Sequence, residues 1–209
     1  MQIEAFFDGR TYTLTYVVFD ENTRDAVIID PVLEKVGQYL RVLEELDCKL
    51  VKAVDTHVHA DHLSGARALA EREDAALHLS VRALGRGLQY VDRVEPVEDG
   101  DRIELGAADV KVIALPGHTS DNTGIFVDGR ALIGGDSLFA DSVARPDLEA
   151  GDEGAVDAAL TLYDTVHERI LPLGDDTILL PCHYVGGRRT DAVAPTLAEA
   201  RNRVHFLSL

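Results

Sequence analysis

The stretch Thr56-His57-Val58-His59-Ala60-Asp61-His62 decides the expected fold of this chain. It places three imidazoles and a carboxylate within six residues, which is far more metal-binding capacity than a hydrophobic core needs. An apolar stretch, 50–54, precedes it, and helical spacing begins at Leu63. Because α/β folds place their chemistry at the carboxyl ends of strands, the stretch predicts a metal centre at a strand end.

Length and composition predict one domain covering residues 1–209. Hydrophobic residues make up 46% of the 209 residues, enough for a sizeable core. No apolar run approaches the ~18 residues of a membrane span, and the N-terminal residues lack the basic and apolar segments of a signal peptide. We therefore expect a cytoplasmic protein without a membrane partner. The two cysteines, Cys48 and Cys182, lie too far apart in sequence to suggest a disulfide framework.

The charge of the chain is strongly acidic, with 37 Asp and Glu against 20 Lys and Arg and a net charge of −17. An acidic, lysine-poor surface is expected of a halophilic protein, because counterions at high salt screen the self-repulsion. The same charge argues against a nucleic-acid partner, since phosphate binding needs clustered cations.

Hydrophobic periodicity predicts two similar halves, each with strands followed by helices. The expected strands are 3–7, 12–19, 26–30, 50–55, 76–79, 101–105, 110–115, 124–127, 131–134 and 177–180. The expected helices are 32–46, 63–72, 154–171 and 195–206, with a loop or short helix at 82–90. Residues 127–130 are expected to form a hairpin turn. This order predicts an α/β (α+β) fold with two mixed sheets between helix layers.

Three later stretches repeat the pattern of an apolar strand that ends in a turn bearing a histidine or an aspartate. They are Leu115-Pro116-Gly117-His118-Thr119-Ser120-Asp121-Asn122, Leu132-Ile133-Gly134-Gly135-Asp136-Ser137-Leu138-Phe139 and Leu179-Leu180-Pro181-Cys182-His183-Tyr184. Four such strand ends are hard to assign to chance. Imidazole and carboxylate donors suit Zn, Fe or Mn.

Spacing suggests two metal positions. In an extended chain residues i and i+2 point to one side, so His57 and His59 can reach one ion, which His118 would complete. The second position would take the remaining residues of this kind, which are Asp61, His62 and His183. Asp136 could bridge two ions or serve one of them.

These residues resemble the metallo-β-lactamase superfamily. The run 56–62 resembles its His-X-His-X-Asp-His signature, and His118, Asp136 and His183 resemble its later ligands, in the right order. The resemblance spans nearly the whole chain. It implies a four-layer αββα sandwich with the metals at one edge, between the sheets.

Finer motifs are similar to those of persulfide dioxygenases (sulfur dioxygenases). That family favours Ala before the Asp, as Ala60 stands here, and the segments 135–139 and 144–148 look like its Gly-Asp-x-Leu-Phe and Gly-Arg-Pro-Asp-Leu motifs. Ala144 departs from the Gly of the second motif. Glyoxalase II shares the first motif but has an aromatic residue in place of Ala60, and it carries a helical domain after the last histidine. Here the chain after His183 is long enough for one helix only.

The dioxygenase resemblance implies one Fe(II) per chain, bound by His57, His118 and Asp136, with open positions for O2 and a substrate sulfur. The other four candidates would orient these ligands and water. The reaction would oxidise a thiol persulfide with O2 and water to sulfite and free thiol. A homodimer is plausible from the same resemblance.

The alternative is a dizinc hydrolase of thioesters or related small molecules. The same seven residues would hold two Zn(II) ions, whose bridging hydroxide would attack a carbonyl while Asp61 orients it. A protein that keeps metal without turnover is a third class, disfavoured because the ligand set is complete.

Four positions are candidate substrate contacts. Arg145 can grip a substrate carboxylate with two parallel bonds, or it can pair with Asp147 or Asp141. Tyr184 can donate a hydrogen bond to substrate or pack at the rim of the site. The pair 188–189, both arginines, can bind a carboxylate-bearing thiol or lie solvated. Cys182 is a reactive thiol near the metal or a small packing residue.

Overall fold

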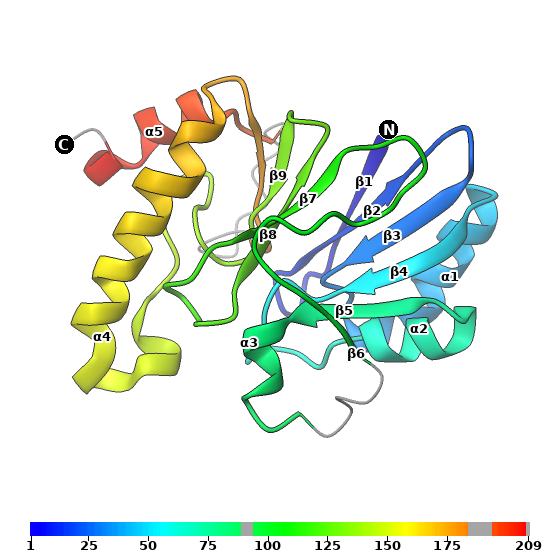
Figure 1. The fold of residues 1–209 in the computed structure, drawn as a ribbon, viewed down its shortest axis with the longest axis horizontal. Coiled ribbons are helices and arrows are strands. Elements are labelled where there is room, and N and C mark those ends of the chain that lie inside the picture. The colour runs from blue at the N-terminus through cyan, green and yellow to red at the C-terminus, as the bar shows by residue number, and fades with distance from the viewer. Residues whose placement is uncertain (89–93, 184–193, 208–209) are drawn as a thin grey trace.

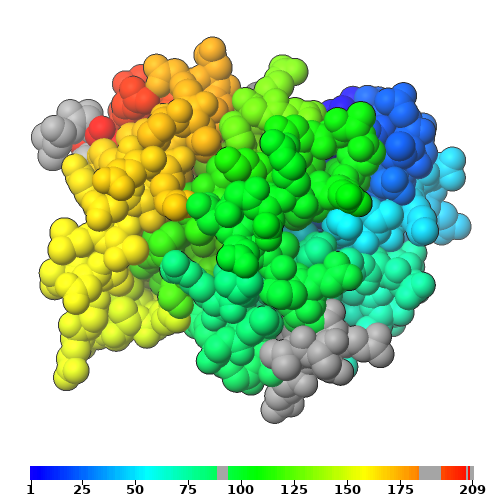
Figure 2. All heavy atoms as spheres, in the orientation of Figure 1, coloured from blue at the N-terminus to red at the C-terminus, as the bar shows by residue number. Residues whose placement is uncertain are grey.

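Two sheets face each other at the centre of the fold, and helices cover the outer face of each (Figure 1). The structure is a computed structural model that describes residues 1–88, 94–183 and 194–207. In the space-filling view, the helical layer after residue 147 and the helices of the first half lie at opposite sides, with the strands of the second sheet between them (Figure 2). The four-layer αββα sandwich that the sequence predicts is confirmed.

The first sheet has six strands in the order β1-β2-β3-β4-β5-β6. They are β1 (Gln2–Phe7), β2 (Leu14–Phe19), β3 (Asp25–Ile29), β4 (Lys49–Val54), β5 (Ala76–Ser80) and β6 (Val94–Val97). The first three strands pair antiparallel and the rest pair parallel. Its covering helices are α1 (Val36–Glu45), which a 3-10 turn (Leu33–Lys35) precedes, α2 (Ala66–Glu73) and the short α3 (Val81–Leu84).

The second sheet has four strands in the order β10-β9-β8-β7. They are β7 (Val110–Ala114), β8 (Thr123–Val127), β9 (Ala131–Ile133) and β10 (Ile178–Leu180). Helix α4 (Asp147–Asp164) and helix α5 (Leu197–Arg203) cover it. Helix α4 continues into a π-helical turn (Thr165–Ile170) and a 3-10 turn (Leu171–Leu173), and His205–Leu207 form a last 3-10 turn.

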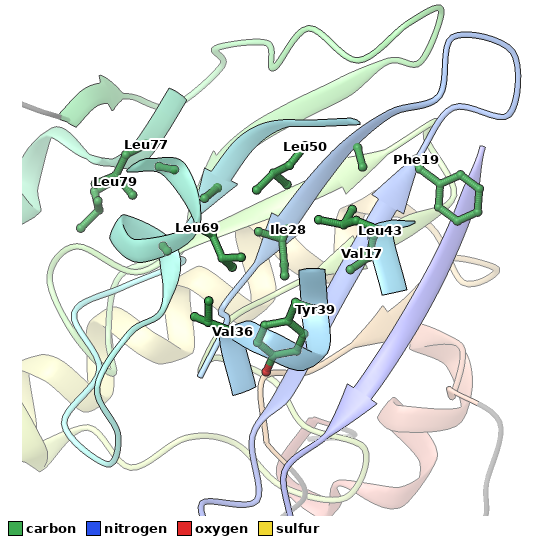
Figure 3. Close-up of a cluster of buried hydrophobic side chains, with 14 of the residues drawn as sticks. Val17, Phe19, Ile28, Val36, Tyr39, Leu43, Leu50, Leu69, Leu77 and Leu79 are labelled. Carbon is green, nitrogen blue, oxygen red and sulfur yellow. The ribbon is translucent and has the colours of Figure 1, made fainter. Parts of the chain in front are cut away.

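Three buried clusters fill the spaces between the four layers. The strand period of two divides the first sheet, so Val17 and Ile28 face the helices while Val18 and Val27 face the second sheet. Figure 3 shows the outer cluster, in which Tyr39 of α1 packs among the strand residues. A third cluster lies between the second sheet and α4 and α5. Because inner strands are covered on both faces, β2 is buried along its whole length.

The expected strand 101–105 is wrong. Only Arg102 pairs, in an isolated bridge with Lys111, although Ile103 and Leu105 are buried as in a strand. Gly100 and Gly106, both with positive φ, lie in turns on either side and leave too little extended chain for a ladder.

The sequence interpretation missed β6 because its motif contains Pro96. Proline cannot donate to a ladder, and β6 lies at the edge of the first sheet, where one row of amides needs no partner. The predicted hairpin at 127–130 is confirmed, since β8 and β9 pair antiparallel across it. Helical turns start at Asp147, but the non-helical Gly151 (φ 64°, ψ −179°) interrupts them, so the continuous part of α4 begins close to the predicted start of the helix 154–171. It changes to π-helical geometry at Thr165.

No helix among the described residues is long and apolar enough to cross a membrane.

Candidate metal centre

The candidate ligands follow the carboxyl ends of β4, β7, β9 and β10. β7 and β9 both pair antiparallel with β8, and β10 pairs parallel with β9, so these three strands end at the same edge. His57 follows β4 of the first sheet, and backbone hydrogen bonds join the two sheets there. The Thr123 amide donates to the Thr56 carbonyl over 2.8 Å, and the Leu14 amide donates to the Cys182 carbonyl over 2.7 Å. The edge therefore brings both halves of the chain together.

The structure assembles His57, His118 and Asp136 into one buried group. Their ligand atoms all lie within 4.8 Å of one another. The rings of His57 and His118 are perpendicular, with centroids 5.4 Å apart, and His118 Nε2 lies 3.5 Å from Asp136 Oδ2. Two imidazoles and a carboxylate at this spacing can hold one metal ion.

Hydrogen bonds orient both imidazoles of this group. His118 Nδ1 donates to the Arg145 carbonyl over 2.8 Å, so Nε2 is the nitrogen that the neutral ring turns toward the group. The Thr56 hydroxyl donates to the Asp30 carboxylate over 2.9 Å and therefore accepts from His57 Nδ1, at 3.0 Å. His57 thus also presents an unprotonated Nε2. Burial, with the neighbouring imidazoles, holds the pKa of His57 well below 6.5, and burial raises the pKa of Asp136.

A second group contains His59, Asp61 and His62, whose ligand atoms also lie within 4.8 Å of one another. His62 Nδ1 lies 3.1 Å from Asp61 Oδ2. His183 lies between the two groups, with Nε2 at 3.8 Å from Asp61 Oδ2 and 3.7 Å from Asp136 Oδ1. All seven predicted residues therefore lie at one edge.

His59 differs from the other imidazoles because it forms a buried ion pair. Its Nε2 lies 3.1 Å from Asp30 Oδ1, and both side chains are almost fully buried. Burial opposes the charged ring, but the Asp30 carboxylate outweighs burial and raises the pKa of His59 to about 9. Only Nδ1 of His59 remains to face a metal. Among the described residues, the set of His57, His59 and His118 expected from spacing is not one of the groups with mutual ligand distances below 4.8 Å.

The donor atoms fit a metal ion. Three of them, Asp136 Oδ1, His59 Nδ1 and His62 Nε2, are buried without a hydrogen-bond partner. Buried polar atoms normally have a partner, and a cation at this edge would supply one to nitrogen and oxygen donors.

A cavity of about 390 Å³ opens over these residues. It is lined by Thr11, Tyr12, His57, Ala60, Asp61, His118, Asp136, Phe139, Ala144, Arg145, Leu148 and His183. Arg145 forms two bonds to Asp147, of 2.9 and 2.6 Å, as the salt-bridge alternative expects. Cys182 is fully buried, and burial raises the pKa of its thiol well above 9.0, which favours the packing alternative. Tyr184 and the arginines at 188–189 lie outside the described residues.

Sequence reasoning missed Tyr12 at the rim of this cavity. Its backbone has a φ of 61°, a conformation that bulky residues rarely adopt, and its side chain is 43% exposed. The turn is stabilised by the Thr11 amide and hydroxyl, which both donate to Asp8 Oδ2. The signal available in the sequence is the turn 8–10 just before it, which does not reveal where the following side chains point.

Comparison with known proteins identifies the class. The family model of the metallo-beta-lactamase superfamily matches residues 8–183, so the chain belongs to that superfamily. Together with the His/Asp groups, this defines a metal-dependent enzyme.

Within the superfamily the chain is similar to persulfide dioxygenases. The mitochondrial persulfide dioxygenase ETHE1 of Bos taurus is 32% identical over 192 residues, which are 91% of this chain and 71% of the relative. The crystal structure of ETHE1 from Myxococcus xanthus is 33% identical, with a TM-score of 0.82 over 100% of this chain and 90% of that chain. A metallo-beta-lactamase structure from Staphylococcus aureus is 26% identical, with a TM-score of 0.89 over 100% of this chain and 63% of that one.

Proposed function

We propose that the protein is an Fe(II)-dependent persulfide dioxygenase. The observation that carries the proposal is the buried group of His57, His118 and Asp136, because two histidines and one carboxylate are the ligand set of non-haem Fe(II) oxygenases. The similarity to persulfide dioxygenases supports the substrate class. The cytoplasmic location and the homodimer stay predictions from the sequence.

The proposed reaction converts R-S-SH, O2 and H2O into R-SH and sulfite with release of two protons. The terminal sulfur loses four electrons, which O2 accepts, and the S–S bond breaks to leave the thiol. Bound Fe(II) would supply the redox chemistry of this oxidation.

The other polar residues at the edge have roles that their positions support. Asp61 and His183 line the cavity beside the iron ligands, where they can hold water and receive protons. Asp61 suits the second task poorly at neutral pH, because the bond from His62 overcomes burial and keeps its pKa below the usual range. His183 is therefore our candidate for the proton acceptor. Ala60 keeps the cavity open, since a larger side chain there would fill it.

Arg145 is the proposed contact for a carboxylate on the thiol carrier. It lines the cavity, and its guanidinium is exposed enough to exchange the Asp147 carboxylate for that of a substrate. Tyr184 stays a predicted substrate contact.

The dizinc hydrolase of thioesters is the second candidate. The unpartnered His59 Nδ1 and His62 Nε2 favour it, because they belong to a second donor group beside the first. In the hydrolase, Asp61, His62 and His183 would bind the second ion.

The deciding experiment is metal analysis of anaerobically purified protein, together with oxygen uptake on a thiol persulfide. We expect one iron per chain and oxygen consumption. Two zinc ions per chain, no oxygen uptake and cleavage of a thioester would overturn the proposal in favour of the hydrolase.

Substitution of single ligands sharpens this test. His118→Ala should remove the metal from either enzyme. His183→Ala should leave iron largely bound in a mononuclear site but strip metal from a dizinc site. Loss of all iron from the His183→Ala protein, while it stays folded, would contradict the three-ligand assignment.

A further inference from the structure

The residues that follow His118 connect its loop to two of the other three ligand-bearing loops, those of His57 and Asp136. The Asn122 side chain accepts the Asp136 amide over 3.2 Å and donates to the Leu115 carbonyl over 2.9 Å. The Thr123 amide and hydroxyl both donate to the Thr56 carbonyl, directly before His57. Asn122 and Thr123 are both buried in the protein interior, so neither side chain is placed to contact a substrate in the cavity.

Asp121 makes the third connection, and it is the one that carries a charge. Its side chain is fully buried. One carboxylate oxygen, Oδ2, accepts the amide of Val58 over 2.9 Å. The other, Oδ1, pairs with Arg86, which also lies 3.4 Å from Glu149 at the start of α4.

The contact to Val58 matters because Val58 follows His57 directly in the chain. The Val58 amide belongs to the peptide group that joins His57 to Val58, so a hydrogen bond to this amide restrains the backbone from which the His57 side chain leaves. A hydrogen bond from an amide to a carboxylate is short and about twice as strong as a neutral one. A buried carboxylate is stable only with its charge compensated, and Arg86 provides that compensation.

We propose that Asp121 is a positioning residue for the metal centre, acting through the Val58 amide to hold His57 at the correct orientation toward His118. Arg86 pairs with the other carboxylate oxygen and so helps to hold the carboxylate in place against that amide. The inference rests on the ligand set of the proposed function, but not on the iron or on the persulfide.

Two variants remove the contact to different degrees. Asp121→Ala removes the acceptor of the Val58 amide and leaves Arg86 without its partner. Asp121→Asn has the same shape but only one acceptor atom, so it cannot satisfy Val58 and Arg86 together. Loss of a group that orients a metal ligand typically weakens metal binding about 10- to 100-fold.

The test is an anaerobic titration of metal-free protein with Co(II), followed by its visible absorption spectrum, with the unfolding temperature of each metal-free protein measured alongside. We expect Co(II) affinity to fall about 10-fold or more in Asp121→Asn and further in Asp121→Ala, with an altered spectrum. A purely structural role would lower the unfolding temperature but leave affinity and spectrum unchanged.

Asp20 provides the matched control. Its carboxylate is also buried, 5% exposed, and it accepts the amides of Asn22 over 2.7 Å and Ala107 over 3.1 Å, after the end of β2 that lies away from the metal-binding edge. Asp20→Asn should lower the unfolding temperature and leave Co(II) binding as in the wild type.

The outcomes separate this inference from the proposed function. If His57→Ala abolishes Co(II) binding but Asp121→Ala binds within about twofold of wild type with the same spectrum, the role of Asp121 is refuted and the ligand set stands. If Asp121→Ala does not fold, the same comparison is made with Asp121→Asn. If His57→Ala binds Co(II) as the wild type does, the ligand set and this inference both fail.

Discussion

Histidines of the site differ in orientation and pKa because their ring nitrogens have different hydrogen-bond partners. Asp30 organises two of them, since it accepts the Thr56 hydroxyl that orients His57 and also pairs with His59. The result is a neutral imidazole and a charged one only two residues apart. His78 lies away from the site, on β5, and is also buried, with 7% of its surface exposed.

The buried His78 predicts a pH dependence of stability. Burial lowers its pKa below 6.5, although its Nδ1 donates to the Glu95 carbonyl. Protonation therefore favours the unfolded chain, and stability is full above the unfolded pKa of 6.5 and is lost as the pH falls below it. We expect His78→Gln to flatten the dependence of the urea midpoint of metal-free protein between about pH 7 and pH 5. Parallel curves for the two proteins would contradict this.

At the scale of secondary structure, helix α4 and the π-helical turn after it fix the position of the His118 loop. The π-helical turn after α4 lies beside the His118 loop, where the Thr165 hydroxyl donates to the Pro116 carbonyl over 2.6 Å. Gly117 has a φ of +139°, and a Cβ there would lie 2.5 Å from the Leu162 backbone of α4. The loop that presents His118 is thus seated directly on the helix.

This close approach predicts a large cost for Gly117→Ala. The variant would need both a backbone conformation reserved for glycine and room within α4, so we expect a loss of at least about 2 kcal/mol in unfolding free energy, together with weaker metal binding. Gly129→Ala is the control, because Gly129 has a φ of +63° but no atom near its Cβ position. It should lose only about 1 kcal/mol and bind metal normally. Equal losses in the two variants would contradict the argument.

The elements near the site were largely predictable, and the failures have physical causes. β4, β7, β9 and β10 are short apolar runs bounded by turns, and such runs reveal strands. Pro96 obscured β6, because proline is compatible with a strand only at a sheet edge and the edge is a tertiary property. The segment 101–105 alternates like a strand, but turns at Gly100 and Gly106 leave too little extended chain for a ladder with β7.

At the scale of the whole molecule, the two halves are held together across the metal-binding edge. The Tyr16 hydroxyl of the first sheet donates to the Pro181 carbonyl at the end of β10 over 2.7 Å. Metal binding at this edge should therefore stabilise both halves together. That residues 1–209 form a single domain stays a prediction from the sequence.

The net charge of −17 predicts that salt stabilises the whole molecule. Screening lengths fall from about 10 Å at 0.1 M salt to about 3 Å at 1 M, so repulsion between surface carboxylates weakens. We expect the unfolding temperature to rise between about 0.1 M and 1 M KCl, measured by calorimetry on metal-free protein. A flat or falling temperature would refute the predicted adaptation to high salt.

The sequence by itself determined the fold class, the strand ends that carry the chemistry and all seven candidate ligands, because these depend on local periodicity and residue type. Only the tertiary structure decided which side chains contact each other within the site. Asp30 reaches His59, and Asp121 reaches the Val58 amide, from strands or loops distant in the chain. Hydrogen-bond geometry depends on how sheets and loops pack, and no sequence pattern encodes it locally. Packing thus separated the group of His57, His118 and Asp136 from the other four candidates, although all seven offer nitrogen or oxygen donors.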